Sequence, residues 1–514
     1  MRMEENKSLL YRFKPIADRL PAVKKPEGHV HFRTKMLWVV VILIVYFFMT
    51  NVYIYGLDQE NTLDLFAQYR TIMAGASGSL LQLGIGPIVT ASIIMQLFVG
   101  AKIIKLDLTN REDKACYQSV LKLLVIAMII IEGVPQVFGF LEPSAKFTST
   151  FGLGGARTLI ILQLAVGSYI IFLMDEVVSK WGIGSGISLF IAAGVSESLF
   201  TGTVNWNPVS AGAVAMDNLP AGTIPKTIYL LGNMDAGTMA NGGYEILLLG
   251  GPNPLIALVG TIVIFLIVAY LESTRIELPL SHGSARGARG RYPIKLIYAS
   301  NIPVILMMAL LANVSMFALL FYTNPGLSGI PFLGNNGLIG YFEPGETQAA
   351  GGFAWYVSAP MGLTTWLLPI LDPGTYGDGL HGPIQQLMRV IIYFTIMVLG
   401  SIMFARFWIS TTNMGAESVA NQIQRSGMQI PGFRRDPRVL RRVLDRYIPI
   451  VTVLSGAIVG AVAAGADLIG TTGNASGTGV LLTVGILIQF YEAMGREQMM
   501  EMHPVMRGFF GEER

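Results

Sequence analysis

Ten stretches of about 20 predominantly apolar residues constrain this chain more than any other feature of its sequence. A helix needs about 20 residues to cross the ~30 Å hydrocarbon core of a bilayer, so each stretch is long enough for one crossing. Only 13% of the 514 residues are charged, against roughly 25% in a soluble domain. The sequence therefore predicts an all-α, polytopic membrane protein with about ten transmembrane helices. The predicted spans are 36–55, 84–104, 120–140, 157–177, 185–203, 255–271, 296–322, 384–409, 447–468 and 477–491.

The second span starts with a break. Residues 83–97 read LGIGPIVTASIIMQL, in which two glycines and a proline precede an apolar run too short to cross alone. Pro87 suits a first helical turn, because its missing N–H has no helical partner there. The preceding stretch, 63–80, is semi-apolar and rich in small residues. Non-helical backbone at membrane depth persists only where protein buries it or a water-filled cavity hydrates it. We therefore expect the chain to surround an aqueous cavity.

Basic residues alternate along the chain in a way that predicts its orientation. They gather in 1–35, 102–114, 275–295 and 425–446, whereas 323–383 contains neither Lys nor Arg. Basic loops stay in the cytoplasm, so the pattern predicts both termini on that side.

The ten predicted spans divide after the fifth into two halves. Because five helices per half give the halves opposite orientations, any internal similarity would be an inverted repeat. The predicted parts are a cytoplasmic amphipathic tail (1–35), an N-terminal half (36–204), an outer loop (204–254), a C-terminal half (255–495) with cytoplasmic loops 273–295 and 410–446 and outer loop 323–383, and a cytoplasmic tail (496–514).

The sequence offers no pattern typical of an enzyme. It contains no G-x-x-x-x-G-K-[ST] phosphate loop, and its five histidines are scattered over loops and tails, so we expect no cofactor and no metal. Glu132 is the clearest charge inside a span, and such a group often marks an ion path. We expect Asp467 to be wetted at an outer helix end and the pair Asp175 and Glu176 to be solvated. Cys116, the sole cysteine, carries no predicted role.

Four motifs in order resemble the SecY family, the channel-forming subunit of the Sec protein translocon, in its archaeal and eukaryotic branch. They are LGIGPIVT at 83–90, KWGIGSGISLFIAAGV at 180–195, YPIKL with SNIPVIL between 292 and 306, and GTGVLLTV at 477–484. The resemblance runs along nearly the whole chain, except for the two large outer loops. It implies two five-helix halves around an hourglass pore.

The resemblance also implies that a ring of apolar side chains closes the waist of the pore. Such a constriction excludes ions by dewetting and can still widen around a peptide. For any single member, ordinary helix packing is the alternative interpretation. The implied ring is Ile85, Val89, Ile187, Ile191, Ile305 and Leu482.

Two further parts are implied by the resemblance. A plug, expected as a short helix over about 63–79, contains the small residues Ala74, Gly75, Ala76, Ser77 and Gly78; the arginine that the family often has near Ala76 is absent. A lateral gate lies between the second and third spans on one side and the seventh and eighth on the other, and would include Thr90, Glu132 and Asn313. Alternatively, Thr90 and Asn313 only bond their own helices.

The basic loops would bind the partner that delivers the polypeptide. Arginines at a Gly-spaced tip suit ribosomal RNA phosphates, although positive-inside topology alone explains some of them. The implied docking residues are Arg286, Arg289 and Arg291 in one loop and Arg434 and Arg435 in the other. The resemblance further implies the small membrane subunits SecE and Secβ, signal sequences and nascent polypeptides as partners, and a location in the lipid bilayer of the plasma membrane.

Two other functions compete with a passive protein-conducting channel. A secondary transporter with an inverted repeat would usually show paired broken helices and several intramembrane charges, whereas this chain shows one strong break and one clear charge. A structural scaffold would not need the broken helix. The sequence therefore favours the channel.

Overall fold

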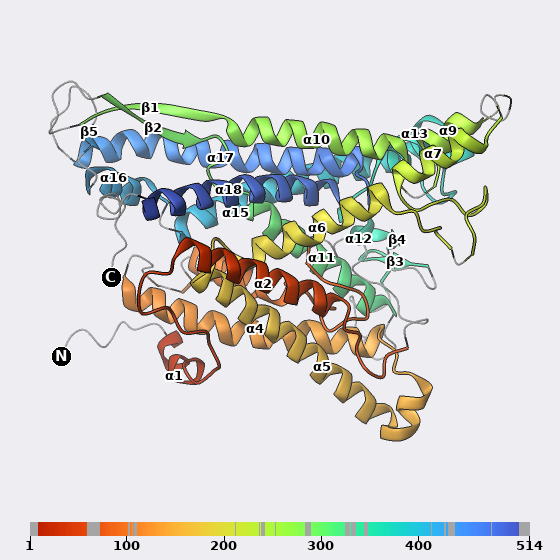
Figure 1. Ribbon diagram of the computed structural model, residues 1–514, viewed down its shortest axis with the longest axis horizontal. Helices are drawn as coiled ribbons and strands as arrows, with labels where there is room; N and C mark the ends of the chain where they lie inside the picture. The colour runs from red at the N-terminus through yellow and green to blue at the C-terminus, as the bar shows by residue number, and fades with distance from the viewer. Residues whose placement is uncertain are drawn as a thin grey trace.

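Long helices lie side by side along the longest axis of the molecule in the computed structural model (Figure 1). The structure describes residues 9–58, 72–100, 103–104, 106, 110–210, 212–235, 237, 242–251, 253–282, 289–323, 329, 336–343, 348–412, 414–425, 428–429, 437–473 and 475–502.

Within these residues, nine helices are long and apolar enough to cross a membrane. A tenth apolar helix, α3 (Gly86–Gly100), is shorter and follows the predicted break. Each of the ten overlaps one predicted span, so the prediction of an all-α fold with ten spans is confirmed. The nine are α2 (Phe32–Thr50), α4 (Arg111–Gly139), α5 (Ala145–Trp181), α6 (Gly186–Val204), α10 (Leu255–Ser273), α11 (Ile302–Thr323), α15 (Pro383–Thr411), α17 (Pro437–Ile469) and α18 (Gly477–Met502).

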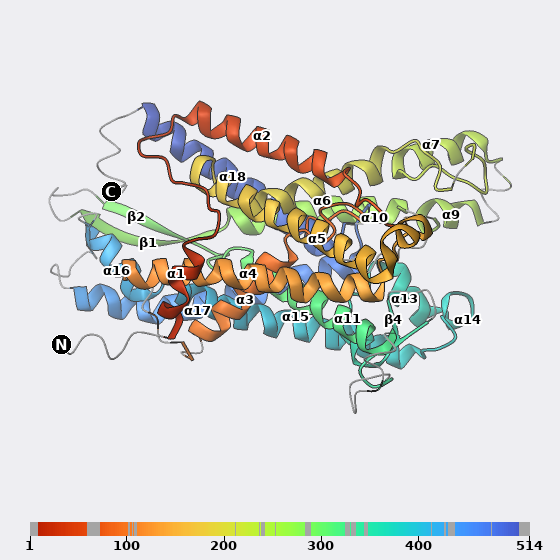
Figure 2. The ribbon, with the colours of Figure 1, turned by 90° about the horizontal axis from the view of Figure 1, so that it is seen from below.

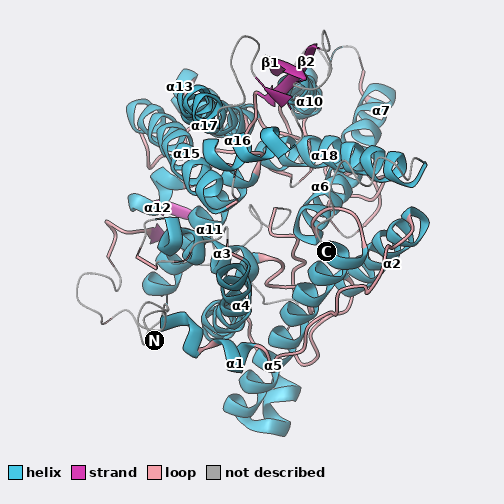
Figure 3. Ribbon diagram, turned by 90° about the vertical axis from the view of Figure 1, so that its left-hand side faces the viewer, coloured by secondary structure: helices cyan, strands magenta, loops and turns pink. Residues whose placement is uncertain are grey.

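The helices form two groups that correspond to the two halves of the sequence. In Figure 1, α2, α4 and α5 occupy the lower part, and α10, α15, α17 and α18 the upper part. The groups meet along two sides. On one side α6 and α2 pack on α18, and on the other α3 packs on α11 and α15 and α4 packs on α11. A view along the helices places α3 between α4 and α11 (Figure 3).

One end of the bundle carries a β-hairpin that the sequence did not predict. Strands β1 (Arg275–His282) and β2 (Arg289–Lys295) pair antiparallel, with Arg275 opposite Lys295. The two-residue strand β5 (Met428–Gln429) joins the other edge of β1, so the two predicted cytoplasmic loops share one sheet. Helix α16 (Ala416–Arg425) lies at the same end (Figure 2).

Short elements cover the opposite end, where the sequence predicts outer loops (Figure 2). Those between α6 and α10 form one group, and those between α11 and α15 form a second group. The elements are α7 (Thr223–Asn233), α9 (Tyr244–Leu248), β3 (Tyr341–Phe342), β4 (Ala349–Gly351), α12 (Gly352–Val357), α13 (Leu363–Leu371) and α14 (Pro373–Tyr376).

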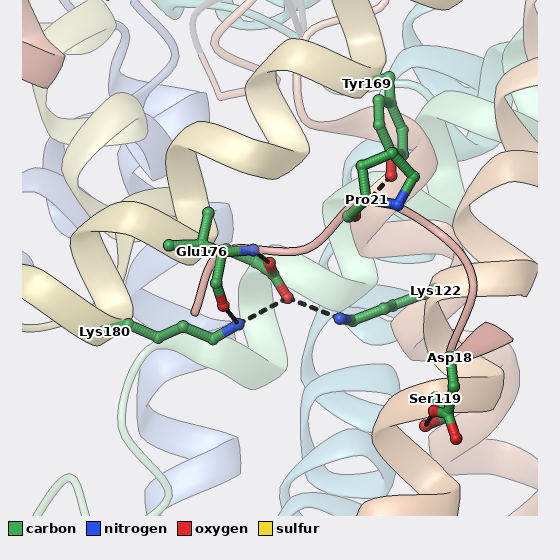
Figure 4. Close-up of polar contacts among 8 residues, drawn as sticks. Asp18, Pro21, Ser119, Lys122, Tyr169, Glu176 and Lys180 are labelled. Atoms are coloured by element: carbon green, nitrogen blue, oxygen red, sulfur yellow. Dashed lines mark hydrogen bonds and ion pairs between the residues drawn. The ribbon is translucent and has the colours of Figure 1, made fainter. Parts of the chain in front are cut away.

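The first described residues fold back over the helices instead of forming a free tail. The helical turns η1 (Leu9–Arg12) and α1 (Lys14–Ala17) lead into an extended segment, and we call residues 9–25 the N-terminal strap. Glu176 accepts a 2.8 Å hydrogen bond from the Val23 N–H, and it pairs with Lys122 and Lys180 at 3.0 and 3.1 Å (Figure 4). The expectation that Glu176 is solvated is therefore wrong, because the strap covers it.

Asp467 also differs from its expected environment. Its side chain is 0% exposed, and it accepts hydrogen bonds from the Tyr393 hydroxyl at 2.6 Å and from the Thr478 N–H at 2.8 Å. The carboxylate thus caps the first turn of α18, where helix N–H groups have no helical partner. The expectation of a wetted Asp467 is wrong, because α17 and α18 turn tightly back on each other.

Candidate pore and gate

The break before α3 depends on a backbone conformation at Gly84 that other residues do not fit. Gly84 has φ +54°, and a Cβ there would overlap the carbonyl oxygen of Met73. That carbonyl accepts a 2.8 Å hydrogen bond from the N–H of Ile85. The close approach of the two segments leaves α3 to begin partway along the bundle, with Pro87 in its first turn.

The six residues of the implied ring all belong to the main apolar core, which runs through both halves of the molecule. Ile85 immediately precedes α3, and Val89 lies in its first turn. The others project from α6, α11 and α18, so both halves contribute. Five of the six are buried, and Ile187 is half-buried and packs against the same cluster. None of the six side chains is exposed.

The described part of the implied plug lies against this cluster. Residues 63–71 lie outside the described residues, and 72–79 form turns, so the predicted short helix is not found in that part. The reason is local, because Ala74 has φ +50° and Gly78 has φ +67°, which no right-handed helix accommodates. Ile72, Met73 and Ala74 nevertheless belong to the same apolar cluster as Ile85.

The five small residues of the segment differ in burial. Ala74 and Gly78 are buried, Gly75 and Ala76 are half-buried, and Ser77 is exposed.

Thr90 and Asn313 meet across the contact between α3 and α11. The Asn313 Nδ2 donates to the Thr90 Oγ1 at 3.0 Å and also to the Ala309 carbonyl oxygen at 2.9 Å. The Thr90 hydroxyl in turn donates to the Gly86 carbonyl oxygen at 3.0 Å. Both alternatives from the sequence are thus present together: each side chain bonds its own helix, and the two bond each other.

Glu132 lies beside this pair in a small cavity that also reaches the plug segment. Its lining includes Glu132 and Gln136 from α4, Asn313 from α11, and Gly75 and Gln82 from the segment before α3. The sequence analysis missed both glutamines, although Gln136 is an amide within a predicted apolar span, which could have indicated it. Polar groups from three separate parts of the chain therefore share one buried site.

The implied docking residues are only partly described. Arg286, Arg434 and Arg435 lie outside the described residues, whereas the backbones of Arg289 and Arg291 belong to β2. A residue that the sequence analysis missed fixes the base of the hairpin: Glu492 of α18 pairs with Arg275 at 3.1 Å and with Lys295 at 2.6 Å.

Two groups of membrane-length helices share one apolar core, and a non-helical segment packs into that core, which is typical of a membrane channel. The SecY family model matches residues 79–491, and a model described as the plug domain of Sec61p matches residues 44–78. The chain belongs to the SecY family. It is a multi-pass membrane protein that forms a protein translocation channel, and this family is not enzymatic.

Relatives of known name agree over almost the full length. The protein translocase subunit SecY of Archaeoglobus fulgidus is 44% identical over 512 residues, covering 98% of this chain and 99% of the relative. That of Haloferax volcanii is 44% identical over 517 residues, covering 97% and 98%.

Solved structures agree as well. A protein-conducting channel superposes with a TM-score of 0.74 at 38% identity, covering 95% of this chain and 98% of the other. Canine Sec61 in a ribosome–channel complex gives a TM-score of 0.72 at 38% identity, with the same coverage.

Proposed function

We propose that Ile85, Val89, Ile187, Ile191, Ile305 and Leu482 form the seal of this channel, and that a translocating polypeptide passes between them. The supporting observation is that all six belong to the main apolar core and come from both halves of the chain. An apolar constriction excludes ions without a rigid barrier, because a narrow passage lined by apolar side chains dewets. The segment 63–79 would be the plug on the outer side of this seal.

Changing the polarity of the seal tests this assignment. Ile187→Asp combined with Ile191→Asn should let reconstituted channels conduct ions without any substrate, since a polar ring holds water. Ile187→Leu combined with Ile191→Val is the matched control, because it keeps the site apolar and should stay closed. Equal resting conductance in the two double variants would reject the seal.

We also propose that the α3–α11 contact is the lateral gate, through which apolar segments leave for the lipid. The hydrogen bond between Asn313 and Thr90 supports this proposal, because it joins the two halves at one point. Such a bond contributes about 0.6–2 kcal/mol between helices in a membrane, which is weak enough to break during opening.

The hairpin end is proposed to face the cytoplasm of a plasma-membrane protein and to bind the ribosome. Basic residues are dense at this end and rare at the other, and canine Sec61 is a relative in a ribosome–channel complex. Arg289 and Arg291 would contact RNA phosphates together with Arg286, Arg434 and Arg435. SecE and Secβ would complete the complex, and signal sequences would enter from this side. Arg289→Glu with Arg291→Glu should weaken ribosome binding, and unchanged affinity would reject these sites.

A further inference from the structure

Tyr46 of α2 reaches the plug segment with its hydroxyl group. The hydroxyl donates a 3.2 Å hydrogen bond to the carbonyl oxygen of Ala74. Both residues are only 1% exposed, so water does not compete for either group. A buried hydroxyl that lost this acceptor would remain unpaired, which makes the contact more consequential than one at the surface.

The ring of Tyr46 is held in the orientation that this bond requires. Phe190 of α6 stacks on it, with ring centroids 5.1 Å apart and planes inclined by 18°. Phe190 is itself fully buried in the main apolar cluster. Helices α2 and α6 of the first half thus form a fixed seat, and the hydroxyl is the polar group on it that meets the plug segment.

Ala74 accepts this bond from a backbone conformation that alanine disfavours. Its φ of +50° is left-handed, and its Cβ crowds the following carbonyl group in that region. The adjacent Met73 carbonyl oxygen receives the N–H of Ile85, a member of the proposed seal. Closing the segment therefore strains one residue beside the junction with α3, and a hydrogen bond from α2 holds that residue in place.

We propose that Tyr46 is a positioning residue that latches the plug segment in its closed seat. This proposal rests on the proposed function of residues 63–79 as the plug. Displacement of the segment breaks this hydrogen bond together with the backbone bonds that the Met73 and Gly78 carbonyl oxygens accept from Ile85 and Ile54, and it lets Ala74 return to ordinary backbone. The relief of strain at Ala74 offsets part of that cost, and the Tyr46 latch adds one hydrogen bond in favour of the closed channel.

Thiol labelling measures how often the segment leaves its seat. Cys116, the only cysteine, is replaced by alanine, and Ser79→Cys supplies a fully buried reporter within the segment. In this background, Tyr46→Phe removes only the hydroxyl and should speed labelling by N-ethylmaleimide about fivefold in reconstituted vesicles, as expected for one net hydrogen bond. Tyr55→Phe, at a side chain 76% exposed, is the matched control and should leave the rate unchanged. Ile72→Cys, also buried, provides a second reporter.

Two further measurements separate the latch from its alternatives. In the chain that retains Cys116, Tyr46→Phe should leave labelling of Cys116 unchanged, since a rise there would show general loosening and overturn the latch. Resting conductance is recorded on the same vesicles. Faster reporter labelling with greater conductance supports both the latch and the plug. Faster reporter labelling with unchanged resting conductance supports the latch but rejects residues 63–79 as part of the barrier. An unchanged labelling rate overturns the latch.

Discussion

Lys226 has a structural role that its charge alone does not reveal. From the sequence it is one of the few basic residues on the predicted outer side. In the structure its side chain is 0% exposed, and its Nζ donates a 2.8 Å hydrogen bond to the Gly250 carbonyl oxygen. It therefore joins α7 to the segment that leads into α10. Burial lowers the pKa of Lys226 to about 8.

This shift predicts a pH dependence of stability. Because the pKa of Lys226 is lower in the folded protein than in the unfolded chain, the unfolded chain binds more protons between about pH 8 and about pH 10.5. Its contribution to the free energy of unfolding should therefore rise through that range. The midpoint of thermal unfolding of wild type, relative to Lys226→Met, should increase between about pH 7 and about pH 10. Lys146→Met, at an exposed lysine, should give a flat difference, and a flat difference for Lys226→Met would contradict the prediction.

At the scale of single residues, the sequence could indicate which side chains are apolar but not which polar ones are buried. The motif match places the ring residues, and the structure finds them in one cluster. Glu176 and Asp467 were misread because their partners, Val23 and Tyr393, are far along the chain and no local pattern connects them. Tyr46 was missed for the same reason, since its acceptor lies across a non-helical segment.

At the scale of elements, long apolar runs were easy to predict and their ends were not. Helix α5 begins at Ala145, before the predicted start at 157, because a short helical segment precedes the span and joins it at a kink, where Gly152 has non-helical backbone with φ +71°. The β1–β2 hairpin was read as exposed loop, because residues 284–291, between the strands and at the start of β2, are rich in arginine and glycine. The pairing of β1 with β5 joins segments too distant for any local signal.

The protection that the N-terminal strap gives to α4 can be measured. Leu10 and Tyr11 pack over the buried Cys116 of α4, and the Tyr11 hydroxyl donates to Asp113. Tyr11→Ala should remove this cover and raise the rate of Cys116 alkylation roughly tenfold, since truncating a packed ring costs more than 1 kcal/mol. His29→Ala, at an exposed residue beyond the strap, is the control. Equal rates in both variants would show that the strap does not protect α4.

At the scale of the whole molecule, the two halves are joined along two sides. On one side α6 and α18 pack closely, and the Lys35 Nζ of α2 pairs with Glu497 of α18 at 2.8 Å. On the other side the Asn313–Thr90 bond links α11 to α3. If the α3–α11 contact is the lateral gate, as proposed, the molecule opens there while the α6–α18 contact keeps the halves together. The polar pair would then set part of the balance between closed and open states.

A double-mutant cycle tests that balance. Thr90→Val and Asn313→Leu each remove one partner, and each should raise the open fraction of reconstituted channels. If the pair acts as a unit, the double variant should open less than the two single effects predict, with a coupling of about 0.6–2 kcal/mol. Thr158→Val is the control, because Thr158 also bonds its own helix, to the Gly154 carbonyl oxygen at 2.8 Å, but lies on α5. Additive effects of Thr90→Val and Asn313→Leu would mean that each side chain only supports its own helix, and that the closed state is held by apolar packing between α3 and α11.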